Sequence, residues 1–341
     1  MRISVILLAL LFLFSCGREE SPMSKYGFRT VEQVSFHPVK SDFLFKPTAI
    51  EVFDSLLLVH DPVEGNTYTL FSISSPDVQI SGGKKGTGPD EVLYGQFTDK
   101  INEKEFQVID MSNGKVLIYN VDSILKSRSF IPVHSFFYNE LAVQKAKGLQ
   151  YCYYLEDSTY IGLGDSNQGK YYCIGKDTVT YWGNYPKDLT MSSSPFYLFQ
   201  GVLQINADRN LLLYHSPTGY YYELYARSGD AWKQRFVEYM PIEHAEDVVT
   251  ENTPCGVSSA DLDNDFVYLL FSGRTLKEYP EETFLASHIF ILTTKGEKVK
   301  CLETDRLNVF MCVERKQNRI YAISRNPDTG EYEVGYYPFA I

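Results

Sequence analysis

Three short segments of this chain contain residue types that could bind an ion or act as a nucleophile. The alternating carboxylates of Asp261 to Asp265 suit calcium, but Phe266 stands where a calcium loop needs glycine and Ser272 where it needs glutamate. Gly82 to Gly88 is rich in glycine, yet it lacks the Gly-Lys-Ser/Thr ending of a phosphate loop, and no helix is expected after it. Gly164 to Ser166 contains a serine without the strand-to-helix turn that would activate it. All three segments are therefore interpreted as turns or loops between strands.

His60 and His215 occupy equivalent places at the ends of two copies of a repeated hairpin, which is described below. Two imidazoles that face a common channel could bind a metal. Other copies carry Asp110 and Ser324 at this place, so solvated turn residues are the favoured interpretation. The sequence has no HExxH motif and no paired Cys/His zinc pattern, and we expect no cofactor and no bound metal.

Cys16 is the residue whose chemistry the sequence predicts most directly. Arg2 is followed by the uncharged apolar run Ile3 to Phe14, which is too short to span a bilayer, and then by the small residue Ser15. The order Leu-Phe-Ser-Cys is similar to the bacterial lipobox, in which the cysteine thiol, and after cleavage the amino group, carry acyl chains. Residues 1–15 are therefore predicted to be a lipoprotein signal peptide, and Cys16 is predicted to be the lipidated residue.

Residues 16–27 are interpreted as the lipidated cysteine and a polar tether that holds the folded part away from the membrane. Gly17 is not the aspartate that is linked to inner-membrane retention, so an outer-membrane lipid anchor is expected. Arg18, Glu19 and Glu20 are similar to a surface-export signal of Gram-negative lipoproteins. Display toward the periplasm and display at the cell surface both remain open.

The net charge of the chain narrows the kinds of partner that it could bind. The chain has 32 Lys and Arg against 43 Asp and Glu, which gives a net charge of −11. Such a chain is a poor match for nucleic acid or an anionic membrane surface, so membrane contact is expected through the lipid anchor only.

The five cysteines other than Cys16 have no CxxC spacing. Buried free thiols are favoured over disulfides of Cys152 with Cys173 or of Cys301 with Cys312.

A recurring hairpin is the most informative pattern in the sequence. Two short apolar strands flank a turn that contains or ends at glycine, a residue that adopts positive φ without a Cβ clash. These glycines are Gly65, Gly114, Gly169, Gly219 and Gly330, at intervals of 49, 55, 50 and 111 residues. The last interval is about twice the others, and a further copy, Val267 to Phe271 with His288 to Leu292, fills it.

Flanking strands bring each unit to four strands, and six such units predict an all-β fold, a six-bladed β-propeller of four-stranded antiparallel blades. Ser129 to Val133 is expected as the outer strand of the second unit, and no helix of useful length is expected. The sixth unit lacks an outer strand, which Arg29 to Phe36 could supply. Residues 28–341 are thus expected to form one domain, a ring closed by an N-terminal strand.

Two further segments connect this repeat with a known family. Gly86-Thr87-Gly88-Pro89-Asp90-Glu91 follows the first unit, and Trp182 to Pro186 follows the third. With the lipobox and the repeat, they make the chain resemble the TolB-like six-bladed β-propeller lipoproteins over nearly its full length. Asp90 stands where the family usually has glycine, whereas Gly86, Gly88, Pro89 and Glu91 keep the motif. The resemblance implies the fold, while molecular functions in the family are mostly unassigned.

In a four-stranded meander, the loops between second and third strands and the loops between blades emerge on one face. This face should gather Lys84 to Val92, Pro186 to Gly201, Pro241 to Cys255 and Arg274 to Ser287. Its candidate binding residues combine aromatic rings with carboxylates, which suits a protein, peptide or glycan partner. They are Tyr197, Phe199, Glu278, Tyr279, Glu282 and Phe284. Aromatic residues that merely pack the loops onto the blades are an equally favoured alternative.

The favoured function is that of a non-catalytic binding or scaffold lipoprotein of the cell envelope that uses this face. The alternative is a metal-dependent hydrolase or lyase that acts in the central channel. It requires carboxylates or imidazoles that converge on the axis, and no such constellation is visible in the linear sequence. A structural module of an envelope complex is a third possibility.

Overall fold

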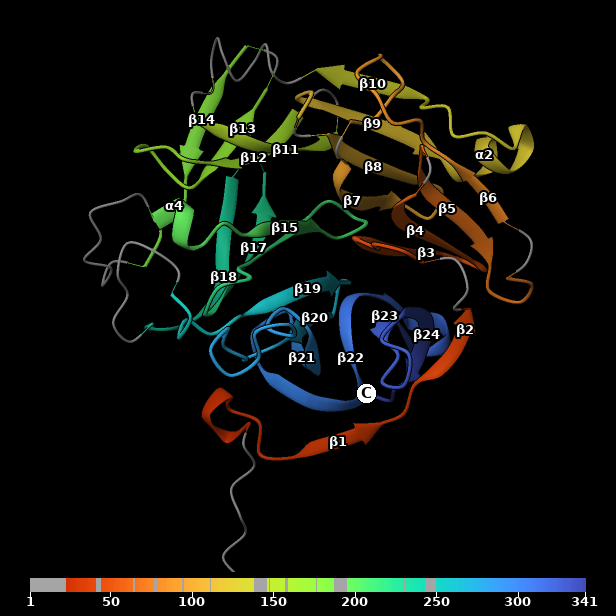
Figure 1. Cartoon of the computed structure of the whole chain (residues 1–341). Helices are drawn as coiled ribbons and strands as arrows, with labels where there is room; N and C mark the ends of the chain where they lie inside the picture. The colour runs from red at the N-terminus through yellow and green to blue at the C-terminus, as the bar shows by residue number, and fades with distance from the viewer. Residues whose placement is uncertain are drawn as a thin grey trace, which may run out of the picture.

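The structure, a computed structural model, describes residues 23–341 except for residues 41–43, 64, 77–78, 94, 111, 138–145, 147, 157–158, 176, 187–194, 230 and 243–249. Its sheets are arranged as blades around a central axis (Figure 1). The predicted signal peptide, Cys16 and most of the predicted tether lie outside the described residues. No helix in the described part is both long and apolar enough to cross a membrane.

The first four blades are separate antiparallel sheets of four strands each. In each blade the chain runs outward from the inner strand, and every strand is hydrogen-bonded to the next along the chain. Blade one consists of β3 (Ala49–Phe53), β4 (Leu56–Val63), β5 (Asn66–Ser72) and β6 (Gln79–Gly82), and blade two of β7 (Gly95–Asn102), β8 (Glu105–Asp110), β9 (Lys115–Asn120) and β10 (His134–Phe137). Blade three consists of β11 (Leu149–Glu156), β12 (Thr159–Gly164), β13 (Tyr171–Ile174) and β14 (Val179–Trp182), and blade four of β15 (Val202–Ile205), β16 (Leu211–His215), β17 (Tyr220–Ser228) and β18 (Ala231–Met240).

Blades five and six form one eight-stranded sheet because they share β22 (Lys298–Glu314). The first part of β22 pairs with β21 as the outer strand of blade five, and its last part pairs with β23 as the inner strand of blade six. The prediction of six blades is therefore confirmed. The remaining strands of these blades are β19 (Val257–Leu262), β20 (Phe266–Phe271), β21 (Ala286–Thr293), β23 (Arg319–Arg325) and β24 (Tyr332–Pro338).

An N-terminal strand closes the ring, as predicted, but it is not the expected segment. β2 (His37–Lys40) pairs antiparallel with β24 and is the outer strand of blade six. The prediction of Arg29 to Phe36 for this role is wrong, because β1 (Val31–Val34) instead pairs in parallel with β22 on the outer edge of blade five. Phe36, between the two strands, is buried with its ring 5.5 Å from that of Tyr337. Its burial fixes the chain where it passes from one blade to the next.

A short helix interrupts blade two, where the sequence predicted none. α2 (Val121–Ser127) begins after Asn120, whose side chain accepts a hydrogen bond from the Ser123 N–H. The helix displaces the outer strand to β10, so the prediction of a strand at Ser129 to Val133 is wrong. Seven residues with two buried side chains are too few to give a helical period. The other helical turns are η1 (Ser24–Tyr26), α4 (Pro195–Leu198) and η2 (Arg315–Gln317).

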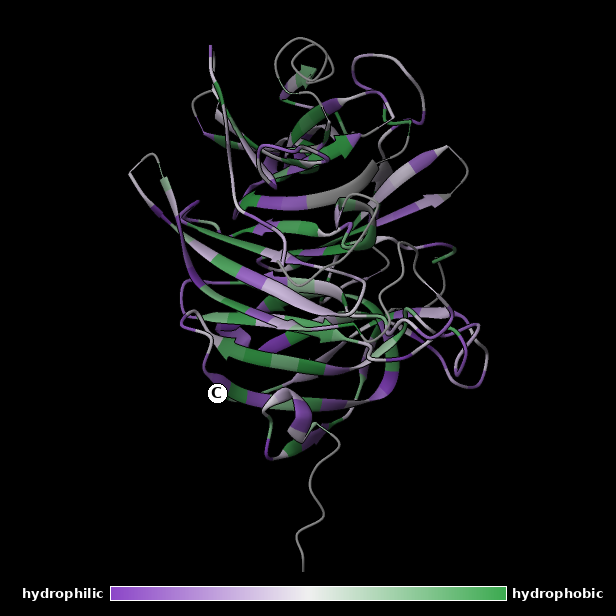
Figure 2. Cartoon of the chain, turned by 90° about the vertical axis from the view of Figure 1, so that its left-hand side faces the viewer, coloured by the Kyte–Doolittle hydropathy of each residue, from purple (hydrophilic) through white to green (hydrophobic). Residues whose placement is uncertain are grey.

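The hydrophobic core lies between neighbouring blades. The second strands are almost entirely buried, and every residue of β16 is buried. Figure 2 shows hydrophobic residues concentrated along the strands. Among the described residues, eleven of the twelve largest fully buried side chains are tyrosines, so much of the aromatic content belongs to the core and not to a binding surface. The five cysteines of the described part are free, and all except Cys173 are buried, as predicted.

Candidate functional site

The loop between β20 and β21 contains most of the predicted binding residues and is ordered by contacts across it. The Ser272 hydroxyl donates to the Thr283 carbonyl oxygen at 2.7 Å, and the Thr283 hydroxyl donates to the Tyr279 carbonyl oxygen at 2.5 Å. Arg274 forms an ion pair with Glu282, with 2.9 Å between Nη1 and Oε2. The Arg274 guanidinium also lies 4.6 Å from the centre of the Tyr279 ring. These contacts fix the shape of the loop.

Three apolar side chains of this loop are exposed to solvent. The exposed fractions are 47% for Leu276, 43% for Tyr279 and 65% for Phe284. Glu278 is exposed beside them, whereas Glu282 is half-buried and occupied by its ion pair. The structure thus places Glu278, Tyr279, Glu282 and Phe284 on one ordered loop, and their role in binding stays a prediction.

Phe199 does not belong to the exposed surface. Its side chain is fully buried, with its ring 5.1 Å from that of Tyr221 and 6.1 Å from that of Tyr239. The alternative interpretation, in which an aromatic residue packs its loop onto the blades, holds for this residue. Tyr197 lies in α4, but its side chain is outside the described part of the chain, as are residues 187–194 and 243–249 of the predicted loops.

The family motif forms a closed turn between blades one and two. The Glu91 carboxylate accepts a hydrogen bond from the Gly88 N–H at 2.9 Å. A Cβ at Gly86 would lie 2.0 Å from the Glu91 Oε2 atom, so a side chain there would displace the Glu91 carboxylate. Lys115 of blade two donates to the Gly88 carbonyl oxygen at 2.6 Å. These contacts support a structural role for Gly86, Gly88 and Glu91, with Pro89 inside the turn.

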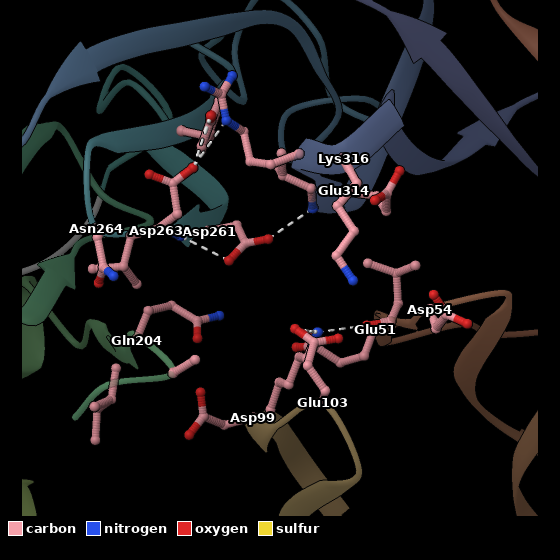
Figure 3. A pocket seen from close by; sticks show the side chains of 18 residues that line it. Glu51, Asp54, Asp99, Glu103, Gln204, Asp261, Asp263, Asn264, Glu314 and Lys316 are labelled. Atoms are coloured by element: carbon pink, nitrogen blue, oxygen red, sulfur yellow. Dashed lines mark hydrogen bonds and ion pairs between the residues drawn. The ribbon is translucent and has the colours of Figure 1, made fainter. Parts of the chain in front are cut away.

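The axis of the ring is polar on the face opposite to the long loops. There, the inner strands and the turns that follow them surround a cavity of about 230 Å³. Figure 3 shows Glu51 of β3, Asp99 of β7 and Asp261 of β19 among the side chains that line it, together with Lys316. Three carboxylates from different blades therefore meet at the axis, as the enzyme alternative requires.

Burial dominates the electrostatics of these carboxylates. It raises the pKa of Asp261 to about 6, although the N–H groups of Val313 and Leu262 donate to this carboxylate and act in the opposite direction. Burial also raises the pKa of Asp99, against the lowering effect of the Arg209 guanidinium. The pKa of Glu51 is raised well above its usual value by burial and then by the charges of Asp261 and Asp99. Burial, and then the proximity of the two aspartates, thus favour the protonated form of Glu51.

The segment Asp261 to Asp265 contains the predicted turn, but the position of Asp261 in the channel was not predicted from the sequence. The Asp263 carboxylate accepts hydrogen bonds from the Asp265 N–H at 2.8 Å and from the Phe266 N–H at 2.7 Å, which confirms the turn. Asp261 precedes this turn in β19 and faces the channel. In the sequence, Asp261 could have been recognised as a carboxylate within an expected inner strand, close to the first turn of its blade. Glu51 and Asp99 show the same pattern.

The other half of the axis, on the face of the long loops, holds a cavity of about 470 Å³ that is lined by both His60 and His215. The favoured interpretation of these residues as solvated turn residues is wrong, since they are only 5% and 3% exposed. Burial lowers the pKa of each imidazole to about 4. Within the described residues, no group of three or more His, Cys, Asp or Glu side chains is arranged to hold a metal ion.

Six four-stranded blades around a central channel define a six-bladed β-propeller. A family model described as "TolB-like 6-blade propeller-like" matches residues 28–316, and the chain therefore belongs to this family. The match excludes the N-terminal segment that carries Cys16. Comparison of the sequence with curated proteins finds no match.

Several solved structures are similar to this chain over most of its length. A member of the DUF4221 family from Bacteroides vulgatus has 11% identity and a TM-score of 0.58, with 91% of this chain and 97% of that chain covered. A candidate exported protein from Bacteroides fragilis has 12% identity and a TM-score of 0.51, with 90% and 95% covered. The β-propeller domain of Cps50 (Swd1) from Myceliophteria thermophila has 8% identity and a TM-score of 0.52, with 89% and 100% covered. At such identities the likeness concerns the fold alone.

Proposed function

We propose that this chain is a lipid-anchored binding protein of the cell envelope that holds a protein partner on the loop from Ser272 to Leu285. The proposal is carried by the exposure of Leu276, Tyr279 and Phe284 on a loop that its own hydrogen bonds keep in shape. An ordered loop loses little conformational entropy on binding. Exposed aromatic side chains are frequent anchors of protein interfaces.

The charge around these side chains favours a particular kind of partner. Glu251, Glu278 and Glu281 are exposed, while Lys277 is the exposed cation of the loop. Complementary potentials steer association and favour correct partners. The expected partner surface is an apolar pocket that is bordered by basic side chains.

Site-specific photocrosslinking in the native envelope tests this proposal. A photoreactive phenylalanine replaces Phe284 in one variant and Ile131 in the control, because Ile131 is comparably exposed, at 58%, but lies in blade two. We expect a discrete adduct from position 284 that disappears when Leu276→Ser and Tyr279→Ser are added. Equal adducts from both positions, or an adduct that survives the added substitutions, would contradict the proposal.

Anchoring through Cys16 is a separate part of the proposal, which rests on the sequence Leu-Phe-Ser-Cys after an apolar run. Metabolic labelling with an alkyne fatty acid should mark the wild-type protein and not the Cys16→Ser variant. Protease treatment of intact cells then separates surface display from periplasmic display. Labelling of Cys16→Ser to the wild-type level would refute the anchor.

A hydrolase or lyase in the channel is the second candidate, and the convergence of Glu51, Asp99 and Asp261 supports it. A general acid or base works best when its pKa lies near the working pH, and the pKa of Asp261 is raised to about 6. Calorimetric titration with calcium or magnesium tests the metal-dependent form. This form requires binding that Asp261→Asn weakens at least tenfold, and an equal affinity of the variant would count against it.

A further inference from the structure

The cavity on the loop face of the axis has the size and lining of a small-molecule site. Its volume of about 470 Å³ falls within the range of roughly 300–1,000 Å³ that such sites occupy. Side chains of blades one, three, four, five and six line it. Its apolar wall consists of Ala49, Ile50, Pro62, Leu93, Val202, Leu203, Ala260, Phe310 and Met311. Such a wall favours a ligand with an apolar body.

Two lysines line the rim of this cavity on one side. The buried Asp61 carboxylate accepts hydrogen bonds from the Phe45 N–H at 2.8 Å and from the Lys46 N–H at 2.6 Å, and this fixes the backbone that carries Lys46. Lys85 is held through its N–H, which donates to the Gly65 carbonyl oxygen at 3.2 Å. Both lysines are exposed, and neither forms an ion pair with any residue in the described part of the chain. Within the described part of the chain, the rim therefore presents two positive charges that no ion pair neutralises.

Two buried imidazoles line the cavity from opposite sides of the ring, since blades one and four face each other in a ring of six. The Nε2 atom of His60 is buried without a hydrogen-bond partner among the described residues, while its Nδ1 atom contacts the Thr48 hydroxyl. The Nδ1 atom of His215 lies 3.2 Å from the Val257 carbonyl oxygen, to which it donates. Both rings are neutral at pH 7 because burial lowers the pKa of each to about 4. They are thus uncharged hydrogen-bonding groups.

Among the described residues that line this cavity, Glu51 is the one carboxylate, and it lies between the two halves of the channel. Burial and the nearby Asp261 and Asp99 raise its pKa, so it neutralises the rim lysines only weakly. The charge of the cavity is therefore concentrated at Lys46 and Lys85.

The geometry points to a binding site for a small organic anion with an apolar body. Its anionic group lies on the side of Lys46 and Lys85, and its body extends along the apolar wall toward the buried imidazoles. This site is distinct from the proposed protein-binding loop, and either can fail without the other. The ligand class is that of monocarboxylates, sulfonates or phosphate monoesters with a ring or a short chain.

A pair of fluorescent probes tests this assignment on the folded protein. The anionic probe is 8-anilinonaphthalene-1-sulfonate, and the neutral probe is N-phenyl-1-naphthylamine, which has the same rings without the sulfonate. We expect one saturable site for the anionic probe, with an affinity that falls as salt rises. Lys46→Ala and Lys85→Ala should each weaken it about fivefold, the order expected of one ion pair near water. Lys84→Ala is the matched control, because Lys84 is also exposed but does not line the cavity.

A blocking variant shows where the probe binds. Ala49→Trp places an indole inside the cavity and should abolish saturable binding, and a retained cooperative thermal transition shows that the variant folds. Affinity unchanged by Ala49→Trp would overturn the location. Equal affinities for the two probes, or a loss with Lys84→Ala as large as with Lys85→Ala, would overturn the assignment to an anion. Absence of saturable binding of either probe would overturn the site.

Discussion

Loss of one partner from the buried ion pair between Lys170 and Glu223 should strongly destabilise the packing of blade three on blade four. The Nζ and Oε1 atoms of the pair are 2.6 Å apart, and the two side chains are 0% and 1% exposed. The Tyr171 hydroxyl donates to Glu223 at 2.5 Å, and the Tyr225 hydroxyl donates to it at 3.0 Å. Lys170 donates to the Tyr221 hydroxyl at 2.9 Å. Both charges are thus compensated within the protein.

Removal of one partner leaves the other charge buried. Lys170→Met leaves the Glu223 carboxylate with neutral donors only, and we expect the free energy of unfolding to fall by about 3–5 kcal/mol. Glu223→Gln should cost less, because burial already lowers the pKa of Lys170 to about 7 and the amine can release its proton. The double variant contains no buried charge, so its loss should be at least about 2 kcal/mol smaller than the sum of the single losses.

Urea unfolding followed by tryptophan fluorescence measures these losses, since the Trp182 ring lies 4.3 Å from that of Tyr171. The control is the pair of Lys104 and Asp122, which has the same 2.6 Å separation but side chains that are 66% and 60% exposed. Lys104→Met should leave the unfolding midpoint unchanged within error. A loss below about 1 kcal/mol for Lys170→Met, or single losses that simply add, would refute the reasoning.

Three further predictions concern pH, the family motif and ring closure. Because folding lowers the pKa of His60 and of His215 from 6.5 to about 4, the unfolded chain binds more protons than the folded chain between pH 4 and pH 6.5. Each histidine should therefore contribute about 3 kcal/mol to the free energy of unfolding, present above pH 6.5 and lost as the pH falls to 4. His215→Asn should flatten the dependence of the free energy of unfolding on pH between 6.5 and 4. Gly86→Ala should lower the free energy of unfolding by about 1 kcal/mol because it displaces the Glu91 carboxylate. In a Glu91→Ala background the same substitution should lower it clearly less, and urea unfolding measures both values. Phe36→Ala should cost about 3 kcal/mol and lower the melting temperature, and an unchanged melting temperature would show that this ring does not help to close the propeller.

The blades were predictable from the sequence because each hairpin combines a local turn signal with buried strands. Four of the five predicted turn glycines, Gly65, Gly114, Gly219 and Gly330, have positive φ, and Gly169 does not. The closing strand was misplaced because both β1 and β2 are short strands at outer edges, and only pairing with distant residues decides their roles. Such non-local pairing leaves little trace in a local pattern.

The candidate sites were harder to predict than the fold. Glu51, Asp99 and Asp261 are single residues in three separate blades, and they meet only because the ring closes. Phe199 and Tyr279 look alike in the sequence, as aromatic residues in long loops. One is fully buried and the other is 43% exposed, because burial depends on how each loop packs on its blades. His60 and His215 were recognised as equivalent, but their burial follows from the channel and not from the hairpin.

The continuous strand β22 makes blades five and six a single mechanical unit. Its 17 residues would extend over about 55 Å at ~3.3 Å per residue, so the strand has to bend between the two blades. No linker there can stretch or act as a hinge. Tension on the outer edge of blade five therefore reaches the channel wall of blade six through the backbone itself. In a pulling experiment the ring should first open at the short β2–β24 contact, and blades five and six should then yield in one step.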